Sequence, residues 1–265
     1  MKITFLGTGT STGVPAIGCQ CRVCLSEDPR DRRTRTSLVM HFEDAGRNVL
    51  IDTVPEFRIQ ALATGLSRVD AVLYTHAHAD HVFGLDDLRQ YCALQGESIP
   101  IYGEKDVLET LRRLFAYALP ENAHRLESWA PKLELRPIQG PFEFFGREMI
   151  PIPLMHGRLG VLGFRTGRFA YCTDCSAIPD DSIALLEDLD VLVLEALRIR
   201  PHPTHINLDQ AVALARRIGA RQTWFVHVAC GAGEMLHDEI SRRLPPDIAL
   251  AHDGLTVSLP SFYPA

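Results

Sequence analysis

Apolar and polar positions along the chain fall into two successive blocks of similar pattern. Each block opens with short apolar or alternating runs separated by turn residues, which is typical of adjacent strands in a sheet. In the first block we predict strands at 2–6, 36–42, 48–52 and 71–75, and helices at 56–66 and 104–119. In the second block we predict strands at 142–145, 149–154, 161–166, 168–173, 191–197, 223–228, 248–251 and 255–259, and helices at 182–189 and 208–220.

In both blocks the run of strands gives way to strands that alternate with helices. This change predicts a layered α/β architecture with sheets inside and helices outside, rather than an all-parallel doubly wound sheet. Cys92, in the run LRQYCAL, fits the core-facing side of a helix. No low-complexity segment or long linker divides the chain, which predicts a single domain over residues 1–265.

The composition is that of an ordinary soluble globular protein. Of the 265 residues, 46% are hydrophobic and 23% are charged, which is enough apolar sequence to bury a full core. No apolar run approaches the roughly 20 residues of a membrane helix, and the apolar start is shorter than a signal-peptide core of about 7 to 15 residues. We therefore expect a cytoplasmic protein that has no membrane partner.

The net charge of −6 argues against a general nucleic-acid surface, because such surfaces carry an excess of Lys and Arg. One segment departs from this balance, with Arg30, Arg32, Arg33 and Arg35 close together. A solvated loop before a strand and a contact with an anion or a partner are both open interpretations of it.

The opening run GTGTSTG does not match the dinucleotide-binding fingerprint. A Rossmann turn leads into a helix whose N-terminus binds the pyrophosphate. Here Gly7, Gly9 and Gly13 lead instead into Pro15, Gly18 and a group of cysteines. We interpret these glycines as a turn in which the backbone approaches another element or a ligand.

Three cysteines lie within six residues in the stretch GCQCRVC: Cys19, Cys21 and Cys24. The chain has seven cysteines, and this odd number with tight local spacing favours reduced thiols over a disulfide framework. Structural zinc takes four tetrahedral ligands, most often thiolates, so this stretch lacks one ligand of such a site.

A second group of cysteines offers an alternative. Cys172 and Cys175 form a C-x-x-C pair that would complete the cluster or act in redox chemistry. Asp174 lies between them, and if it points toward a metal its neighbours face the fold interior, where small buried thiols are suitable.

The most informative stretch is YTHAHADH, directly after the predicted strand 71–75. It contains four residues with metal-binding side chains: His76, His78, Asp80 and His81. His76 and His78 are two residues apart, so in an extended chain they share one side and converge on one ion. The turn that follows directs the other two toward a second ion, about 3.5 to 4 Å from the first as in binuclear hydrolytic sites. Zinc and manganese both accept this mixture of imidazole and carboxylate.

Two ions need more ligands than these four residues provide. Three further polar side chains follow apolar runs that predict strands: His156, Asp174 and His227. Because strand ends carry residues to the edge of a sheet, we expect these side chains to join the first cluster.

With these residues the chain resembles the metallo-β-lactamase superfamily of binuclear hydrolases. The family motif HxHxDH matches His76, His78, Asp80 and His81, and the later histidine, aspartate and histidine also match. The similarity spans nearly the whole chain. It implies a four-layer αββα sandwich with the site at the sheet edges, but it says much less about the substrate.

The resemblance also implies a role for each matched residue. The first ion would be held by His76, His78 and His156. The second ion would be held by Asp80, His81 and His227. Asp174 would bridge the two ions, and Asp52 matches the family's carboxylate that supports a metal-bound histidine.

Within the superfamily, the run GTGTSTGVPAIGCQCRVC is similar to the phosphodiesterase branch that includes the cyclic phosphoribosyl phosphodiesterase of phosphonate breakdown. RPHPTHINLDQA and HVAC also resemble segments of that branch. There, three cysteines bind a structural zinc together with a residue three places after the last metal histidine, which here is Cys230. The resemblance thus implies a zinc knuckle near residues 18–36 with four thiolates, where the branch has histidine as the fourth ligand.

The resemblance therefore implies a phosphodiesterase with two active-site ions, zinc or manganese, and one structural zinc. Two ions that share a water lower its pKa toward neutrality, and the hydroxide would attack a small diester such as phosphoribosyl cyclic phosphate or a cyclic nucleotide. The family match places His205 to protonate the leaving group, with Asp80 as a second catalytic residue. Arg198 and Arg200 would add phosphate contacts, and we interpret His202 as a loop residue.

Other activities on the same scaffold are alternatives: a tRNA 3′-end endonuclease, a thioester hydrolase, and a redox or carrier protein of quinone-cofactor biosynthesis. The acidic chain shows no Gly-rich or basic arm for tRNA, and it ends before the helical domain of a glyoxalase II type thioester hydrolase. A zinc-knuckle interaction module would not need seven further ligands. The resemblance also implies a homodimer.

Overall fold

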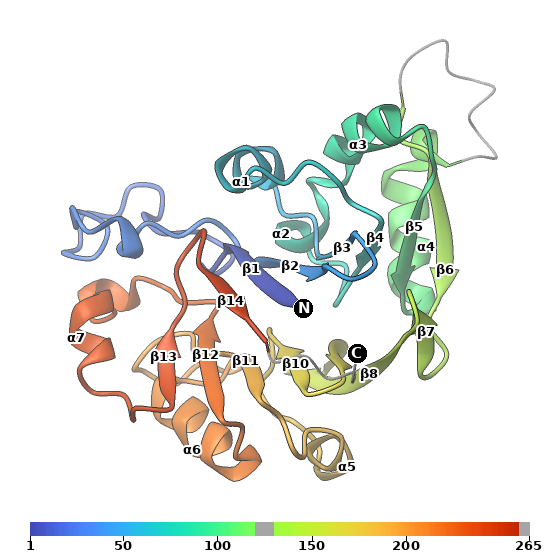
Figure 1. Ribbon diagram of the computed structural model, residues 1–265. Coiled ribbons are helices and arrows are strands. Elements are labelled where there is room, and N and C mark those ends of the chain that lie inside the picture. The colour runs from blue at the N-terminus through green and yellow to red at the C-terminus, as the bar shows by residue number, and fades with distance from the viewer. Residues whose placement is uncertain (120–129, 260–265) are drawn as a thin grey trace.

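The computed structural model describes residues 1–119 and 130–259. These residues form two seven-stranded sheets packed face to face, with helices on both outer sides (Figure 1). The αββα sandwich that the resemblance implied is confirmed.

The first sheet has the strand order β14-β1-β2-β3-β4-β5-β6. Its strands are β1 (Lys2–Gly7), β2 (Ser37–Phe42), β3 (Arg47–Ile51), β4 (Ala71–Leu73), β5 (Ile99–Gly103), β6 (Leu133–Pro137) and β14 (Thr256–Ser258). The strands β1 to β3 are antiparallel neighbours, whereas β3 to β6 are parallel. Four helices cover its outer face: α1 (Phe57–Thr64), α2 (Ala79–Val82), α3 (Leu88–Gln95) and α4 (Lys105–Leu114).

The second sheet repeats this plan with the order β13-β12-β11-β10-β9-β8-β7. Its strands are β7 (Phe142–Phe144), β8 (Arg147–His156), β9 (Leu159–Thr166), β10 (Phe169–Cys172), β11 (Val191–Glu195), β12 (Gln222–Val226) and β13 (Ile248–Leu250). Antiparallel pairing from β7 to β10 changes to parallel pairing from β10 to β13. Its helices are α5 (Asp180–Ala184), α6 (Leu208–Ile218) and α7 (His237–Ser241). The two similar blocks of the sequence thus correspond to the two sheets, except that β14, from the end of the second block, pairs with β1 in the first sheet.

Three hydrophobic clusters separate the four layers. Between the sheets, Ile3 and Phe5 of β1 belong to the same buried cluster as Phe164 and Val193 of the second sheet. Leu6 belongs instead to the cluster beneath the helices of the first sheet. Successive side chains of a strand point to opposite faces, so a strand inside four layers is apolar on both.

Two strands were not predicted. Pro100 lies in β5 and Pro137 in β6, and a proline within an apolar run argues against a strand because it donates no ladder hydrogen bond. Two predicted helices are also shorter than their patterns. The helix at 104–119 ends at Leu114 and is followed by a 3₁₀ turn, and the helix at 182–189 corresponds to α5, which ends at Ala184.

The glycine-rich turn after β1 makes the close approaches that we expected. A Cβ atom on Gly7 would lie 2.0 Å from the Arg35 carbonyl oxygen, and one on Gly9 would lie 2.8 Å from that of Arg33. Only glycine fits such contacts. The interpretation of these glycines as a turn against another element is confirmed.

For Arg33 the solvated-loop interpretation is wrong. Arg33 is 3% exposed, and its guanidinium donates to Thr8 Oγ1 at 2.8 Å and to the Ala251 carbonyl oxygen at 2.6 Å. These contacts attach the arginine segment to the β1 turn and to the end of β13. Arg30 instead forms ion pairs with Asp28 and Asp238 at the surface.

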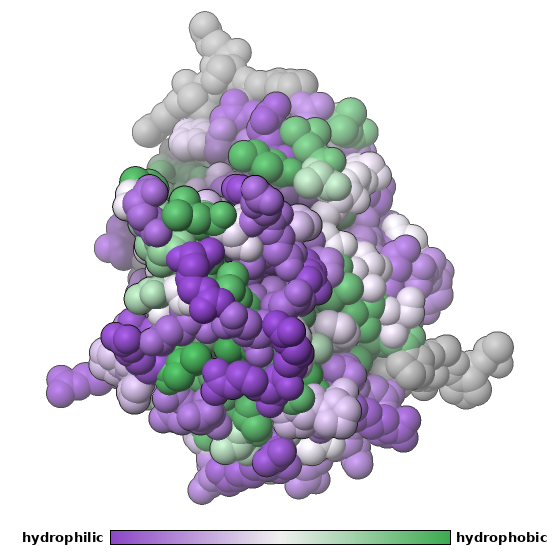
Figure 2. Space-filling model, turned by 90° about the vertical axis from the view of Figure 1, so that its left-hand side faces the viewer, coloured by the Kyte–Doolittle hydropathy of each residue, from purple (hydrophilic) through white to green (hydrophobic). Residues whose placement is uncertain are grey.

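Figure 2 shows a face of the molecule on which apolar residues lie in small groups among polar ones. In the part of the chain that the structure describes, no helix is both long and apolar enough to cross a membrane.

Candidate metal centre

In the first sheet, two strand ends that precede predicted site residues lie side by side. β3 and β4 are parallel, and Ile51 pairs with Leu73. Asp52 therefore leaves the sheet beside the histidine-rich stretch that begins at His76. This register explains why a carboxylate and a histidine cluster more than 20 residues apart meet at one edge.

The second sheet contributes through its own parallel strands. Cys172 pairs with Leu194, and Glu195 pairs with Val226. Three acidic or imidazole side chains thus emerge at one edge of this sheet: Asp174, Glu195 and His227. His156 reaches the same place from the end of β8.

The backbone turns sharply at three of these strand ends. Asp52, Asp174 and His227 have left-handed backbone angles, with φ of 60°, 52° and 57°. A non-glycine residue in that region costs about 1–3 kcal/mol, and such strain gathers at functional sites. The fold therefore fixes these side chains at an energetic cost.

Three imidazoles form one side of the centre. The ring centroids of His76 and His78 are 4.5 Å apart, those of His78 and His156 are 5.2 Å apart, and those of His76 and His156 are 5.8 Å apart. The three predicted ligands of the first ion are therefore adjacent.

The carboxylate of Asp174 lies at the middle of the centre. Its Oδ2 is 3.3 Å from His81 Nε2, and its Oδ1 is 3.1 Å from His227 Nε2. Asp80 Oδ2 lies 3.5 Å from the same His81 nitrogen. The structure thus gathers all seven predicted ligands, with the proposed bridging carboxylate between the two sets.

Buried nitrogens without hydrogen bonds test whether this centre suits a metal. His76 Nε2 and both ring nitrogens of His227 are buried and have no hydrogen-bond partner among the described residues. His227 Nε2 is close to Asp174, but the geometry is not that of a hydrogen bond. Buried polar atoms are nearly always satisfied, so these nitrogens fit coordination to a cation.

Supporting contacts orient the ring nitrogens. His81 Nδ1 lies 2.7 Å from Asp52 Oδ2, and the Thr75 amide donates to Asp52 Oδ1 at 2.9 Å. His156 Nδ1 donates to the Thr204 carbonyl oxygen at 2.9 Å. The contacts of His81 and His156 each place a proton on Nδ1 and leave Nε2 free to bind a metal, as is usual for metal-binding histidines.

The charges of the centre are strongly coupled. Burial alone would lower the pKa of His81, but Asp174 and Asp52 outweigh it and raise the pKa well above its usual value. Burial would likewise raise the pKa of Asp174, but His227 and His81 hold it well below its usual range. Positive charge nearby therefore stabilises the ionised form of these carboxylates, and divalent cations would supply that charge.

Glu195 is a site residue that sequence analysis missed. It is fully buried, its Oε2 lies 2.9 Å from His205 Nδ1, and its Oε1 accepts from the Ile206 amide at 3.0 Å. The available signal was a carboxylate within the apolar run VLVLEAL. Because apolar residues follow it, the run looked like uninterrupted strand.

His205 lies against the two ligand sets. Its ring centroid is 4.6 Å from that of His156 and 4.9 Å from that of His227. A capping box between Asn207 and Gln210 starts α6 directly after it and fixes this loop. Burial, followed by the charge of His227, lowers the pKa of His205 to about 4.

A second cluster of metal-binding side chains is made of thiols. The sulfur atoms of Cys19, Cys21, Cys24 and Cys230 all lie within 4.8 Å of one another. Burial is the main cause that raises the pKa of Cys24 to about 12. Four thiols this close do not ionise together without a cation, so the cluster fits a tetrahedral zinc.

The alternative that the C-x-x-C pair completes this cluster is wrong. Cys172 and Cys175 are fully buried in the core beneath the second sheet. Burial raises the pKa of Cys172 to about 12, which opposes the thiolate that redox chemistry needs.

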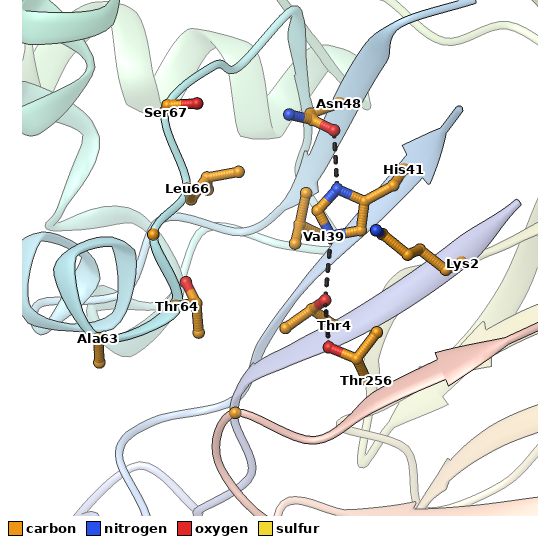
Figure 3. A pocket seen from close by; sticks show the side chains of 12 residues that line it. Lys2, Thr4, Val39, His41, Asn48, Ala63, Thr64, Leu66, Ser67 and Thr256 are labelled. Carbon is orange, nitrogen blue, oxygen red and sulfur yellow. Dashed lines mark hydrogen bonds between the residues drawn. The ribbon is translucent and has the colours of Figure 1, made fainter. Parts of the chain in front are cut away.

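A cavity of about 510 Å³ lies away from these clusters, on the outer face of the first sheet (Figure 3). Across it runs a row of hydrogen-bonded side chains: Asn48, His41, Thr4 and Thr256. No predicted metal ligand lines this cavity, and these four side chains hydrogen-bond to one another. We assign no ligand to it.

The sequence profile of the β-lactamase superfamily domain matches residues 47–228. The chain therefore belongs to the metallo-β-lactamase superfamily, a class of metal-dependent hydrolases. It is similar to a solved structure described as a new diphosphatase from the PhnP family, with 42% identity, a TM-score of 0.88 and 98% coverage of both chains.

A further relative is an octanoyltransferase from Porphyromonas gingivalis, 41% identical over 256 residues. The match covers 96% of this chain but 51% of that protein, so the chain spans about half the length of this relative.

More distant likenesses extend across the fold. Zn²⁺-bound PqqB from Methylobacterium extorquens is 21% identical, with a TM-score of 0.77 and coverage of 98% of this chain and 100% of that chain. This likeness shows the fold alone. A ribonuclease Z from Crocosphaera subtropica is 26% identical over 318 residues, covering 100% of this chain and 94% of that protein.

Because side chains from both sheets form this candidate centre, chelation of ions bound there should destabilise the whole sandwich. A ligand at about 100 times its Kd adds about 2.7 kcal/mol, which corresponds to a fall in Tm of about 5–10 °C on chelation. Thermal melting with and without chelator, and after zinc or manganese is restored, measures this. An unchanged Tm in a protein that has lost two ions would contradict ligation from both sheets.

Proposed function

We propose that this chain is a binuclear metal-dependent phosphodiesterase that cleaves a small phosphodiester, cyclic diesters included. The carrying observation is the pair of His205 and Glu195 beside the two ligand sets, because it adds a proton-donating group to a site for two cations. The 42% identity to a protein described as a diphosphatase supports a substrate that contains a phosphoryl group.

The metal ions are part of this proposal. We assign zinc or manganese to the seven-ligand centre and a structural zinc to the four-thiol knuckle. When bound, the pair of ions would activate water as a nucleophile and offset the negative charge of the phosphate.

Glu195 and His205 together control the proton that reaches the leaving oxygen. Burial raises the pKa of Glu195 well above its usual range, although His227 opposes this, and burial lowers that of His205. The neutral pair therefore places one proton between Glu195 Oε2 and His205 Nδ1 and keeps another on Nε2. When Nε2 donates its proton to the leaving oxygen, the proton of Glu195 passes to Nδ1, so the ring never becomes an anion.

Asp80 has a different role from the Glu195–His205 pair. Burial would raise its pKa, but the contact with His81 lowers it, so Asp80 is ionised at neutral pH. An ionised carboxylate at this position would help hold a cation and would accept a hydrogen bond from the attacking water.

A substrate panel tests the proposal against its alternatives. The metal-replete protein is offered bis-p-nitrophenyl phosphate, cyclic nucleotides, cyclic ribose phosphates, a tRNA precursor, and thioesters including an octanoyl thioester. Preferential cleavage of a small diester supports the proposal. Preference for the tRNA precursor or a thioester would replace it with the corresponding alternative.

Replacement of His205 with alanine should lower kcat about 10²–10⁴-fold for diesters with an alkoxide leaving group, the usual contribution of a general acid. p-Nitrophenolate leaves without protonation, so bis-p-nitrophenyl phosphate should lose less than about tenfold. Steady-state kinetics on both substrates, with metal content measured in parallel, checks this. Equal losses on the two substrates would contradict proton donation by His205.

A further inference from the structure

His202 lies at the outer end of a row of imidazoles that starts at the metal centre. His205 is in contact with the ligands His156 and His227, and the His202 ring is 5.0 Å from that of His205. His202 is half-buried and takes no part in the chemistry described above. It is thus one ring farther from the ligand cluster than His205, which we propose protonates the leaving oxygen.

The loop that carries His202 is held firmly. Pro201 and Pro203 flank the histidine and fix their own backbone angles. The guanidinium of Arg198 donates to the Pro201 carbonyl oxygen at 3.0 Å. Close by, the Thr204 carbonyl oxygen accepts from His156 Nδ1 at 2.9 Å, which ties the loop to a metal ligand.

The loop also determines which nitrogen of His202 is left as a donor. The Thr204 amide donates to His202 Nδ1 at 3.3 Å, so the ring proton belongs on Nε2. In the described part of the chain no residue hydrogen-bonds to that Nε2. Burial, with help from His205 and Arg198, lowers the pKa of His202, which is therefore a neutral donor at pH 7.

We infer that His202 Nε2 donates a hydrogen bond to an oxygen of the leaving group beyond the scissile bond, and that this contact positions a leaving group with a hydroxyl or ring oxygen there. This inference rests on the proposed phosphodiesterase function. A neutral donor suits a hydroxyl or ring oxygen, whereas the phosphate charge is met by the ions. His202 is thus a substrate-positioning residue rather than the plain loop residue that the sequence suggested.

The test uses two substrates and three variants. A 2′,3′-cyclic nucleotide has ribose as its leaving group, whereas bis-p-nitrophenyl phosphate has no hydroxyl there. His202→Ala should raise KM for the cyclic nucleotide about 3–10-fold, the fold-change of one net hydrogen bond, and leave kcat and the bis-p-nitrophenyl phosphate kinetics within twofold. His202→Gln, whose amide donates from a similar position, should recover most of the loss. His252 is a half-buried histidine elsewhere in the chain, and His252→Ala should leave the kinetics on both substrates unchanged.

Binding of the nucleoside monophosphate product, measured by calorimetry on metal-loaded protein, gives a second readout without turnover. His202→Ala should weaken this product about 3–10-fold and leave inorganic phosphate unaffected. Unchanged KM and product affinity, an equal loss on both substrates, or a fall in kcat alone would overturn the inference. A wild-type protein that cleaves no diester would instead refute the proposed function, and product binding would still decide the role of His202.

Discussion

Replacement of Asp174 with alanine should lower kcat/KM for a diester by at least about a thousandfold and reduce the metal content from three ions per chain toward one. The carboxylate lies 3.3 Å from His81 and 3.1 Å from His227 in the second ligand set, and it also clusters with His76 and His156 of the first set. Its loss would remove the group that we propose bridges both ions, and with them the activation of water and the charge stabilisation. Elemental analysis and steady-state kinetics on the same preparations measure both effects.

Asp188 provides a matched control for this variant. It is also an aspartate with a left-handed backbone, at φ 56°, but it lies in the turn before β11 and away from the ligands. Asp188→Ala should keep the full metal content and activity. An Asp174→Ala protein that keeps two active-site ions, or that turns over at the wild-type rate, would refute the bridging role.

Replacement of Cys230 with serine should release the knuckle zinc and lower Tm by at least about 10 °C, because structural zinc contributes its binding free energy to folding. Cys230 lies three residues after His227 and joins thiols from the start of the chain. At a temperature where the variant is folded, the active-site ions and turnover should persist. Thermal melting and zinc content report the outcome.

Cys230→His tests the same site without deleting a ligand. Imidazole also binds tetrahedral zinc, so this variant should keep the knuckle ion and most of the stability. If Cys230→Ser had the wild-type Tm and zinc content, Cys230 would not be the fourth ligand. If both variants lost the zinc equally, the geometry at position 230 rather than the ligand type would determine zinc binding.

The metal centre was largely predictable from the sequence, because its residues follow short, strongly apolar runs. The HxHxDH motif is local, and His156, Asp174 and His227 each follow an apolar run near a strand end. Glu195 follows the same logic but was hidden by the apolar residues after it.

Other features depend on contacts that no local pattern reveals. The burial of Arg33 depends on Thr8 and on Ala251, which is 218 residues away in sequence. The strand β5 pairs with β4 and β6 despite Pro100, because tertiary pairing outweighs the local preference. The two-block pattern predicted the sheets, but it did not predict these individual strands.

The short segment from His227 to Cys230 supplies the last side chain of both candidate metal clusters. During synthesis on the ribosome, neither cluster is complete until this segment has emerged. By then some 150 to 200 residues have been translated after the thiols at 19–24 and the histidines at 76–81. Completion of both clusters therefore belongs to the end of translation.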